Sequence, residues 1–212
     1  MTLTPFFIVN VLCKIESQGE AGGRLIESIS RFSRLPLESC REISLKEIVE
    51  SANDILRFKV NFEEIDYQIN LPDTLPILYA HPVFAEAFVN LIDNANDAIK
   101  ERADKLEFRA KNNGEPPAPY RGSIAISAAE RDSQIEIEVE DNGIGIKKEN
   151  ARNLFLPFYT TKATTNKGTG LGLYVIKRIV SDHGGRISID SDYMRGTKFT
   201  ITLPIRQKGK EA

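Results

Sequence analysis

A strict alternation of apolar and polar residues over residues 65–71 is the feature that most constrains the fold of this chain. Successive side chains of a strand point to opposite faces, so this pattern predicts a half-buried strand. Residues 124–126 and 135–139 are predicted to be paired strands, joined through a turn at residues 131–133. Three further strands are predicted, at residues 77–80, 186–190 and 198–203. The chain is therefore expected to build a sheet that turns one face toward a core.

Helical patterns lie between these strands. Ser44 is expected to cap a helix over about residues 45–56. A long helix is predicted from residue 81 to about residue 102, and a third over residues 170–183, ended by Gly184 in a left-handed conformation. Residues 111–119 and 141–168 are predicted to be loops. Strands interleaved with helices and followed by hairpins predict an α+β fold, a two-layer sandwich with helices on one face of the sheet.

The first 40 residues differ from the rest. The apolar residues of 25–35 recur at helical spacing, Pro36 ends that pattern, and a lone amphipathic helix needs a partner surface. Residues 6–12 are apolar but too few to span a bilayer, and two cysteines, Cys13 and Cys40, suggest a reducing compartment. We expect a soluble, cytoplasmic protein, or a soluble piece of a longer one.

The charge of the chain excludes one class of partner. It has 28 Lys and Arg against 30 Asp and Glu, a net charge of −2. This balance gives no sign of a surface for nucleic acid. Function must therefore be sought in short clusters of residues, of which three contain unusual chemistry.

The first cluster is residues 141–146, directly after an apolar strand. Gly143 and Gly145 would let the backbone approach a flat ligand, and Asp141 could accept a hydrogen bond from an amino group. The alternative is a hairpin turn, because Asn142 followed by Gly143 is the strongest short signal for one. The residues alone leave both interpretations open.

The second cluster, residues 168–173, opens the third predicted helix. Amide groups at a helix N-terminus bind phosphate through their unpaired N–H groups and the helix dipole. The cluster is not a dinucleotide fingerprint, because the polar residues 160–167 stand where a strand should precede it, and it is not a Walker P-loop, because no Gly-Lys-Ser/Thr follows. A glycine-rich linker is the alternative.

The third cluster lies in the long helix, where Asn90, Asn94 and Asp97 are spaced i, i+4 and i+7. This spacing puts them on one face. Their oxygens are of the hard type that Mg²⁺ prefers, together with phosphate. A polar face exposed to solvent is the alternative.

The order of these clusters resembles that of a known family. Residues 90–98, 141–145, 155–162, 168–173 and 196–197 resemble, in this order, the N, G1, F, G2 and G3 boxes of sensor histidine kinases. Those kinases share the Bergerat ATP-binding fold with gyrase, heat-shock chaperone and mismatch-repair ATPases, the GHKL superfamily. The resemblance covers about residues 41–206. It implies a domain division into a partial dimerisation region with a flexible N-terminus at 1–40, the ATP-binding catalytic domain at 41–207, and a disordered tail at 208–212.

The resemblance also implies a Mg²⁺–ATP site. It assigns Asn94 as the metal ligand, Asn90 to the same phosphates as a second catalytic residue, and Asp141 to the adenine amino group. Residues 159–168 would form a mobile lid, and Phe155 and Phe158 would hold the lid to the core. The other residues that it places around the nucleotide are Asp97, Gly143, Gly145, Ile146, Thr161, Lys162, Gly168, Gly170, Leu171, Gly172, Leu173 and Thr197.

Two departures from the family qualify this assignment. Hydrolytic relatives have a glutamate where Asn90 stands, and an amide cannot accept a proton from water at neutral pH. The phosphoacceptor histidine is also missing, because the chain has two histidines, His81 and His183, and neither has the family's sequence context. We therefore expect a bacterial histidine kinase catalytic domain that acts on a histidine of a dimerisation domain outside this segment. Its expected partners are that domain, a sister chain in a homodimer and a response regulator. A nucleotide-binding module without catalysis and an anti-sigma serine kinase are the alternatives.

Overall fold

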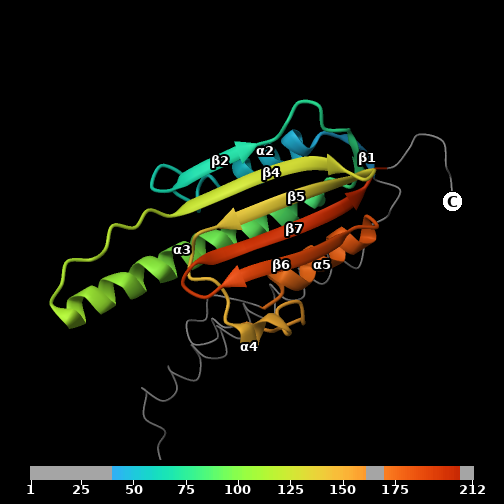
Figure 1. Cartoon of the computed structure of the whole chain (residues 1–212). Helices are drawn as coiled ribbons and strands as arrows, with labels where there is room; N and C mark the ends of the chain where they lie inside the picture. Colours follow the sequence, from blue (N-terminus) through green and yellow to red (C-terminus); the bar gives the residue numbers. More distant parts are fainter. Residues whose placement is uncertain (1–39, 161–169, 206–212) are drawn as a thin grey trace, which may run out of the picture. The chain divides into compact units, whose positions relative to one another are not determined.

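Five strands form one mixed sheet in the computed structural model, which describes residues 40–160 and 170–205. The strands lie in the order β2-β4-β5-β7-β6. Strand β2 is parallel to β4, and the other neighbours are antiparallel. The strands span Asp66–Asn70 (β2), Ser123–Arg131 (β4), Gln134–Asp141 (β5), Arg186–Asp192 (β6) and Gly196–Pro204 (β7). Figure 1 shows this sheet in front of the helices.

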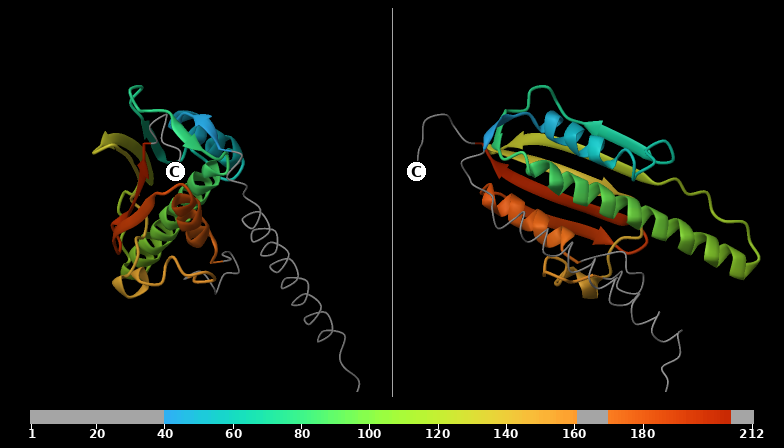
Figure 2. Two further views of the ribbon diagram at one scale, coloured as in Figure 1. Left: turned by 90° about the vertical axis from the view of Figure 1, so that its right-hand side faces the viewer. Right: turned by 180° about the vertical axis from the view of Figure 1, so that it is seen from behind.

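Helices cover one face of this sheet, as predicted. Helices α2 (Leu45–Leu56), α3 (Phe84–Asn113) and α5 (Gly172–Asp182) lie side by side behind it, which the reverse view in Figure 2 shows directly. A short helix α4 (Lys148–Ala151) lies within the predicted loop 141–168. A separate two-stranded sheet pairs β1 (Arg41–Ile43), which the sequence did not predict, with β3 (Leu78–Ala80). The predicted two-layer α+β fold is therefore confirmed.

The core lies between the sheet and the helices. Strands β4, β5 and β7 bury every second side chain, as their periodicity requires. Phe84, Phe88 and Ile92 of α3 are completely buried on the helix side. Strand β2 differs from its prediction, because Ile69 is 41% exposed although Ile65 is buried. Strand β2 forms an edge of the sheet, so its pattern of burial is weaker than its sequence suggests.

Local sequence signals predicted the start of α2 but not the end of α3. Ser44 caps α2 with the expected reciprocal bonds, Glu47 N–H to Ser44 Oγ at 3.1 Å and Ser44 N–H to Glu47 Oε2 at 3.0 Å. Helix α3 continues past Arg102 to Asn113, so it includes the first residues of the predicted loop 111–119. Alanine, leucine, lysine, arginine and glutamate dominate this extension, and these residue types favour helix without tertiary contacts.

Several predicted features fall outside the described residues. These are the helical pattern at residues 25–35, the lid residues 161–168 and the tail at 208–212. Within residues 40–160 and 170–205, no helix is long and apolar enough to cross a membrane.

Candidate functional site

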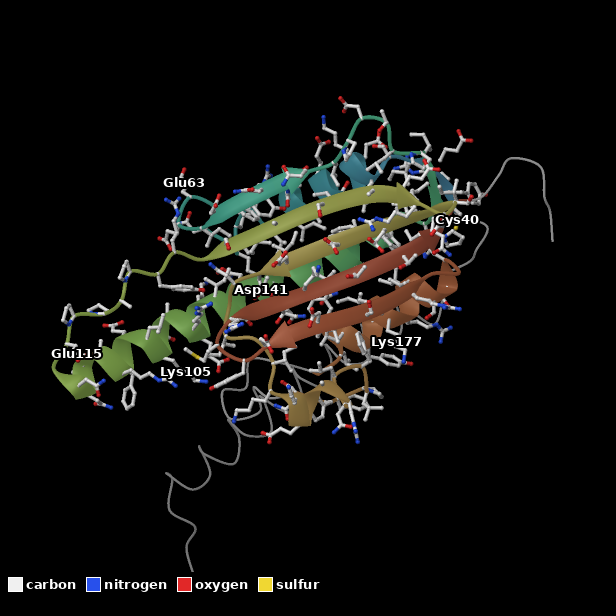
Figure 3. The ribbon with its side chains drawn as sticks, in the orientation of Figure 1. Cys40, Glu63, Lys105, Glu115, Asp141 and Lys177 are labelled. Carbon is white, nitrogen blue, oxygen red and sulfur yellow. The ribbon has the colours of Figure 1, made fainter. Side chains whose placement is uncertain are left out.

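A buried carboxylate stands at the end of strand β5. Asp141 is in phase with the buried residues Ile137 and Val139, so its side chain points toward the helices. It lies opposite Thr197 of β7, which is also buried. Figure 3 labels Asp141 at this strand end. The pleat of the sheet therefore brings one charged and one hydroxyl side chain to the face that otherwise forms the core.

The surroundings of Asp141 change its acidity. Its side chain is 8% exposed, and the Gly143 N–H donates to Oδ1 at 2.7 Å. Burial raises the pKa of Asp141 to about 7, Glu140 adds to this rise, and backbone N–H groups of Gly143 and Thr197 oppose it. Charged groups are expensive to bury, so a carboxylate in such a position is a candidate for ligand recognition.

The structure contradicts a hairpin turn at residues 141–145. Strand β5 pairs with β4 and β7, and the chain after Asp141 does not return along it. Instead, Ile144 N–H donates to the carbonyl of Ala98 in α3 at 2.9 Å. A Cβ atom on Gly143 would lie 2.6 Å from the backbone carbon of Ala98, which is too close for any side chain. Gly143 is thus required for the approach of the loop to α3, whereas its predicted contact with a ligand stays a prediction.

A glycine is required at position 145 for a comparable structural reason. Its φ is +67°, and a Cβ atom there would lie 2.1 Å from the carbonyl oxygen of Asp192. The loop is thus held between α3 and the turn from β6 to β7. The next residue, Ile146, is half-buried, and its N–H donates to Ser191 Oγ at 2.9 Å.

Ser191 was missed by the sequence analysis. Its hydroxyl donates to the Gly196 carbonyl at 2.9 Å and lies 3.0 Å from Thr197 Oγ1. Because the Ser191 proton is used on Gly196, Thr197 is the donor to Ser191, which leaves lone pairs of Thr197 Oγ1 for another donor. The signal that could have found Ser191 is its place in β6, two residues after Ile189 and directly opposite Thr197.

The two asparagines of α3 lie beside the start of α5. Asn90 Nδ2 donates to the Glu86 carbonyl at 2.8 Å, which directs Oδ1 away from its own helix backbone. A Cβ atom on Gly172 would lie 3.2 Å from Asn90 Oδ1 and 3.9 Å from Asn94 Nδ2. Both asparagines are half-buried, as is Asp97 nearly one turn after Asn94. The alternative interpretation, a polar helix face exposed to solvent, is therefore wrong for Asn90 and Asn94.

Residues 170–173 lead into a helix, so a plain linker is also wrong. Helix α5 begins at Gly172 with no side-chain cap, and its first N–H groups have no partner within the helix. Leu171 is buried and its carbonyl accepts from Val175 N–H at 2.8 Å, while Leu173 is half-buried. Gly170 has a φ of +68° and contacts the backbone of Phe158. The predicted site residues Thr161, Lys162 and Gly168 lie outside the described residues.

The expectation for Phe158 was wrong. Its side chain is 55% exposed and Phe155 is half-buried, whereas Leu154 is 8% exposed. Leu154, and not Phe158, is the apolar side chain that holds this segment to the core. The backbone of Phe158 carries its contact, through Gly170.

The two histidines contact each other. His183 Nε2 accepts from the backbone N–H of His81 at 3.0 Å, and His183 Nδ1 lies 2.7 Å from the Ile179 carbonyl. His81 Nδ1 accepts from Val83 N–H at 3.0 Å. Both nitrogens of His183 are thus engaged in structural hydrogen bonds, one as acceptor and the other, by necessity, as donor.

Comparisons with known proteins agree with this geometry. A family model described as "Histidine kinase-, DNA gyrase B-, and HSP90-like ATPase" matches residues 81–207. The chain is 30% identical over 171 residues to sporulation kinase E of Bacillus subtilis, covering 80% of this chain and 20% of that kinase. It is 31% identical over 170 residues to the sensor histidine kinase ZraS of Escherichia coli K12, covering 80% of this chain and 32% of ZraS.

Solved structures share the fold. The catalytic domain of the histidine kinase ThkA matches with a TM-score of 0.59 at 24% identity, over 78% of this chain and 95% of that domain. The Acinetobacter baumannii histidine kinase AdeS matches with a TM-score of 0.62 at 20% identity, over 98% of this chain and 88% of AdeS.

The family match spans more than half of the chain, so the chain belongs to the histidine kinase-, DNA gyrase B- and HSP90-like ATPases. Its relatives are sensor histidine kinases, and it contains their catalytic ATP-binding domain. The resemblance inferred from the order of the boxes is thus confirmed. The chain spans only a fifth to a third of the length of the two curated relatives described above.

Proposed function

We propose that this chain binds Mg²⁺–ATP and transfers the γ-phosphate to a histidine supplied outside it. The observation that carries the proposal is the position of Asn90 and Asn94 beside the first residue of α5, Gly172. Carboxamide oxygens and helix N-terminal amides thereby meet at one place. That combination suits a phosphate chain with a divalent cation.

The adenine end of the site is assigned to the region around Asp141. Its buried carboxylate can accept a hydrogen bond from the adenine amino group, and Thr197 can support the same group through water. Guanine presents an oxygen at that position, which leaves the carboxylate unpaired and repelled. Gly143, Gly145 and Ile146 complete this part of the proposed pocket.

The phosphate end is assigned to α3 and α5. The amides at the start of α5, at Gly172 and Leu173, would donate to phosphate oxygens, with Gly170 and Leu171 alongside. Asn94 would ligate the metal through its carboxamide oxygen, with Asn90 and Asp97 on the same helix face. Mg²⁺, when bound, neutralises phosphate charge. Thr161, Lys162 and Gly168 are proposed to complete this end from the lid.

The chain is poorly suited to hydrolysis. Asn90 stands where a general base would be needed, and its Nδ2 is used on the Glu86 carbonyl. The nitrogens of His183 are used within the fold. The acceptor is therefore proposed to be a histidine of a dimerisation domain, with residues 1–40 as part of that region and residues 41–207 as the catalytic domain. The wider proposal includes a homodimer, a response regulator and a cytoplasmic location, by analogy with the family.

Calorimetry with Mg²⁺–ATP tests the metal assignment. Asn94→Ala should weaken Mg²⁺-dependent binding by about 2–3 kcal/mol, the scale for a hydrogen bond or contact to a charged group. Asn112→Ala is the matched control, because Asn112 is an exposed asparagine of the same helix and should bind normally. Unchanged affinity in Asn94→Ala would refute the role of Asn94.

Phosphotransfer tests the activity itself. γ-Labelled ATP, this chain and a separately prepared histidine-bearing helical hairpin should yield acid-labile, base-stable label on the hairpin. Binding of ATP without transfer would favour a regulatory module, and label on serine of an anti-sigma antagonist would favour a serine kinase. A chain that binds no Mg²⁺–ATP at all would refute the proposal as a whole.

A further inference from the structure

Arg102 of α3 lies outside every box of the family pattern but contacts the loop that follows Asp141. Its Nη1 donates to the carbonyl of Asn142 at 2.6 Å and to the carbonyl of Arg195 at 3.0 Å. Its guanidinium carbon lies 4.9 Å from the centre of the Tyr120 ring. One side chain thus joins α3 to the loop after β5 and to the turn between β6 and β7.

The contact with Asn142 has a direct consequence for Asp141. The carbonyl of Asn142 and the N–H of Gly143 belong to the same peptide group, which is planar and rigid. Arg102 holds the oxygen end of this group, and its N–H end donates to Asp141 Oδ1 at 2.7 Å. A charged donor on the carbonyl also polarises the peptide and strengthens its N–H as a donor. Arg102 therefore contributes to the orientation of the Asp141 carboxylate through this peptide plane, while the backbone N–H of Thr197 bonds the carboxylate from β7.

Other contacts also hold this loop, and one of them shares the Asn142 carbonyl oxygen with Arg102. Tyr120 Oη donates to Asn142, 3.1 Å from both its carbonyl oxygen and Oδ1. The Asn142 side chain accepts from Ser123 N–H at 2.8 Å and donates to the Arg121 carbonyl at 2.9 Å. All of these partners lie at the approach to β4. They attach the loop to the sheet, whereas Arg102 and the bond from Ile144 N–H to the Ala98 carbonyl attach it to the helix that carries Asn90 and Asn94.

The burial of Arg102 also carries a cost in folding free energy. Within the described part of the chain, Arg102 Nε is buried without a hydrogen-bond partner. A buried donor without a partner costs folding free energy, so an apolar side chain of similar length would avoid that cost.

We propose that Arg102 is a positioning residue for adenine recognition, which aims the Asp141 carboxylate by fixing the peptide group between Asn142 and Gly143. This inference rests on the proposed ATP site. It assigns Arg102 to base selectivity and not to the binding of phosphates, because its contacts lie at the Asp141 end of the site.

Binding of three ligands to the full chain separates these roles: ATP, GTP and inorganic tripolyphosphate, each with Mg²⁺. Arg102→Met should weaken ATP binding by about tenfold and reduce the preference for ATP over GTP by a similar factor. Affinity for tripolyphosphate should stay within about twofold. Arg102→Lys restores a charged donor and should recover part of the ATP preference. Arg109→Met, an exposed arginine of the same helix, is the control and should match wild type for all three ligands.

A second readout needs no nucleotide. The amide proton of Gly143 should have an NMR shift typical of a hydrogen bond to a carboxylate, and that signal should move in Arg102→Met and not in Arg109→Met. Equal losses for ATP and tripolyphosphate, or an unchanged Gly143 signal, would overturn the proposal and leave Arg102 with a structural role only. A wild-type chain that binds no ATP would refute the proposed function, while the Gly143 signal would still report whether Arg102 controls Asp141.

Discussion

The raised pKa of Asp141 should make the protein less stable as the pH rises. Burial raises the pKa of this carboxyl from its ordinary value of 3.8 to about 7. Between these two values, the folded chain retains a proton that the unfolded chain has released. Stability must therefore fall with rising pH across this window, the opposite of a carboxylate in an ion pair. The perturbation to test is Asp141→Asn, which cannot ionise.

The size of the effect follows from the two pKa values. Each unit of difference corresponds to about 1.4 kcal/mol, so the full window represents roughly 4 kcal/mol. Part of this change occurs below pH 5 and little remains above pH 7. Between pH 5 and pH 8, the linkage relation leaves a loss of about 2–3 kcal/mol in the free energy of unfolding.

Urea denaturation at pH 5, 6, 7 and 8 measures this loss. The quantity of interest is the change in unfolding free energy from pH 5 to pH 8 in wild type minus the same change in Asp141→Asn. This difference removes the constant free energy of the hydrogen bond that is lost in Asp141→Asn, and it removes every pH-dependent contribution that the two proteins share. Asp73→Asn, at an exposed loop position, is the control and should retain the wild-type slope. Equal slopes in wild type and Asp141→Asn would refute the reasoning.

ATP affinity of the wild-type chain should fall about tenfold from pH 8 to pH 6, because the adenine amino group needs the ionised Asp141; calorimetry should find no such fall in Asp141→Asn. Gly143→Ala should lower the free energy of unfolding by about 2–3 kcal/mol, because the new Cβ atom would collide with the backbone of Ala98. Gly114→Ala should lower it by about 1 kcal/mol, because only the left-handed backbone opposes a side chain there and no atom lies within 4 Å. Chemical denaturation of both variants measures the two values. The chain alone should acquire no histidine label from γ-labelled ATP, because an aligned acceptor is missing; acid-labile label that is lost on substitution of His81 or His183 would contradict this.

Hydrophobic periodicity and local capping signals in the sequence determined which face of β5 is buried and where α2 begins. The alternation in β5 assigns Ile135, Ile137 and Val139 to one face, and it extends to Asp141, so the burial of that carboxyl follows from its phase alone. The cap of α2 at Ser44 needs only residues three positions apart. The order of the five clusters was also sufficient to indicate the family, because each cluster is a short segment.

Longer-range features escaped local reasoning. Strand β1 has three residues and exists through its pairing with β3. The exposure of Ile69 depends on which strand lies at the edge of the sheet, and the contact of Phe158 passes through its backbone. The spacing of residues in the sequence does not predict the exposure of Ile69 or the backbone contact of Phe158, because both depend on residues that are distant in the chain.

Tertiary structure alone decided how the site is assembled. Asn90 meets Gly172 only because α3 and α5 lie side by side on the same face of the sheet. Gly143 is required by a helix that precedes it in the sequence. Arg102 of α3, Tyr120 of the segment before β4 and Ser191 of β6 all bond the same loops. Hydrophobic periodicity determines which face of an element is buried, since it depends on residues one to four positions apart. Which polar groups then meet depends on strand order and helix packing, since those bring together residues that are far apart in the chain.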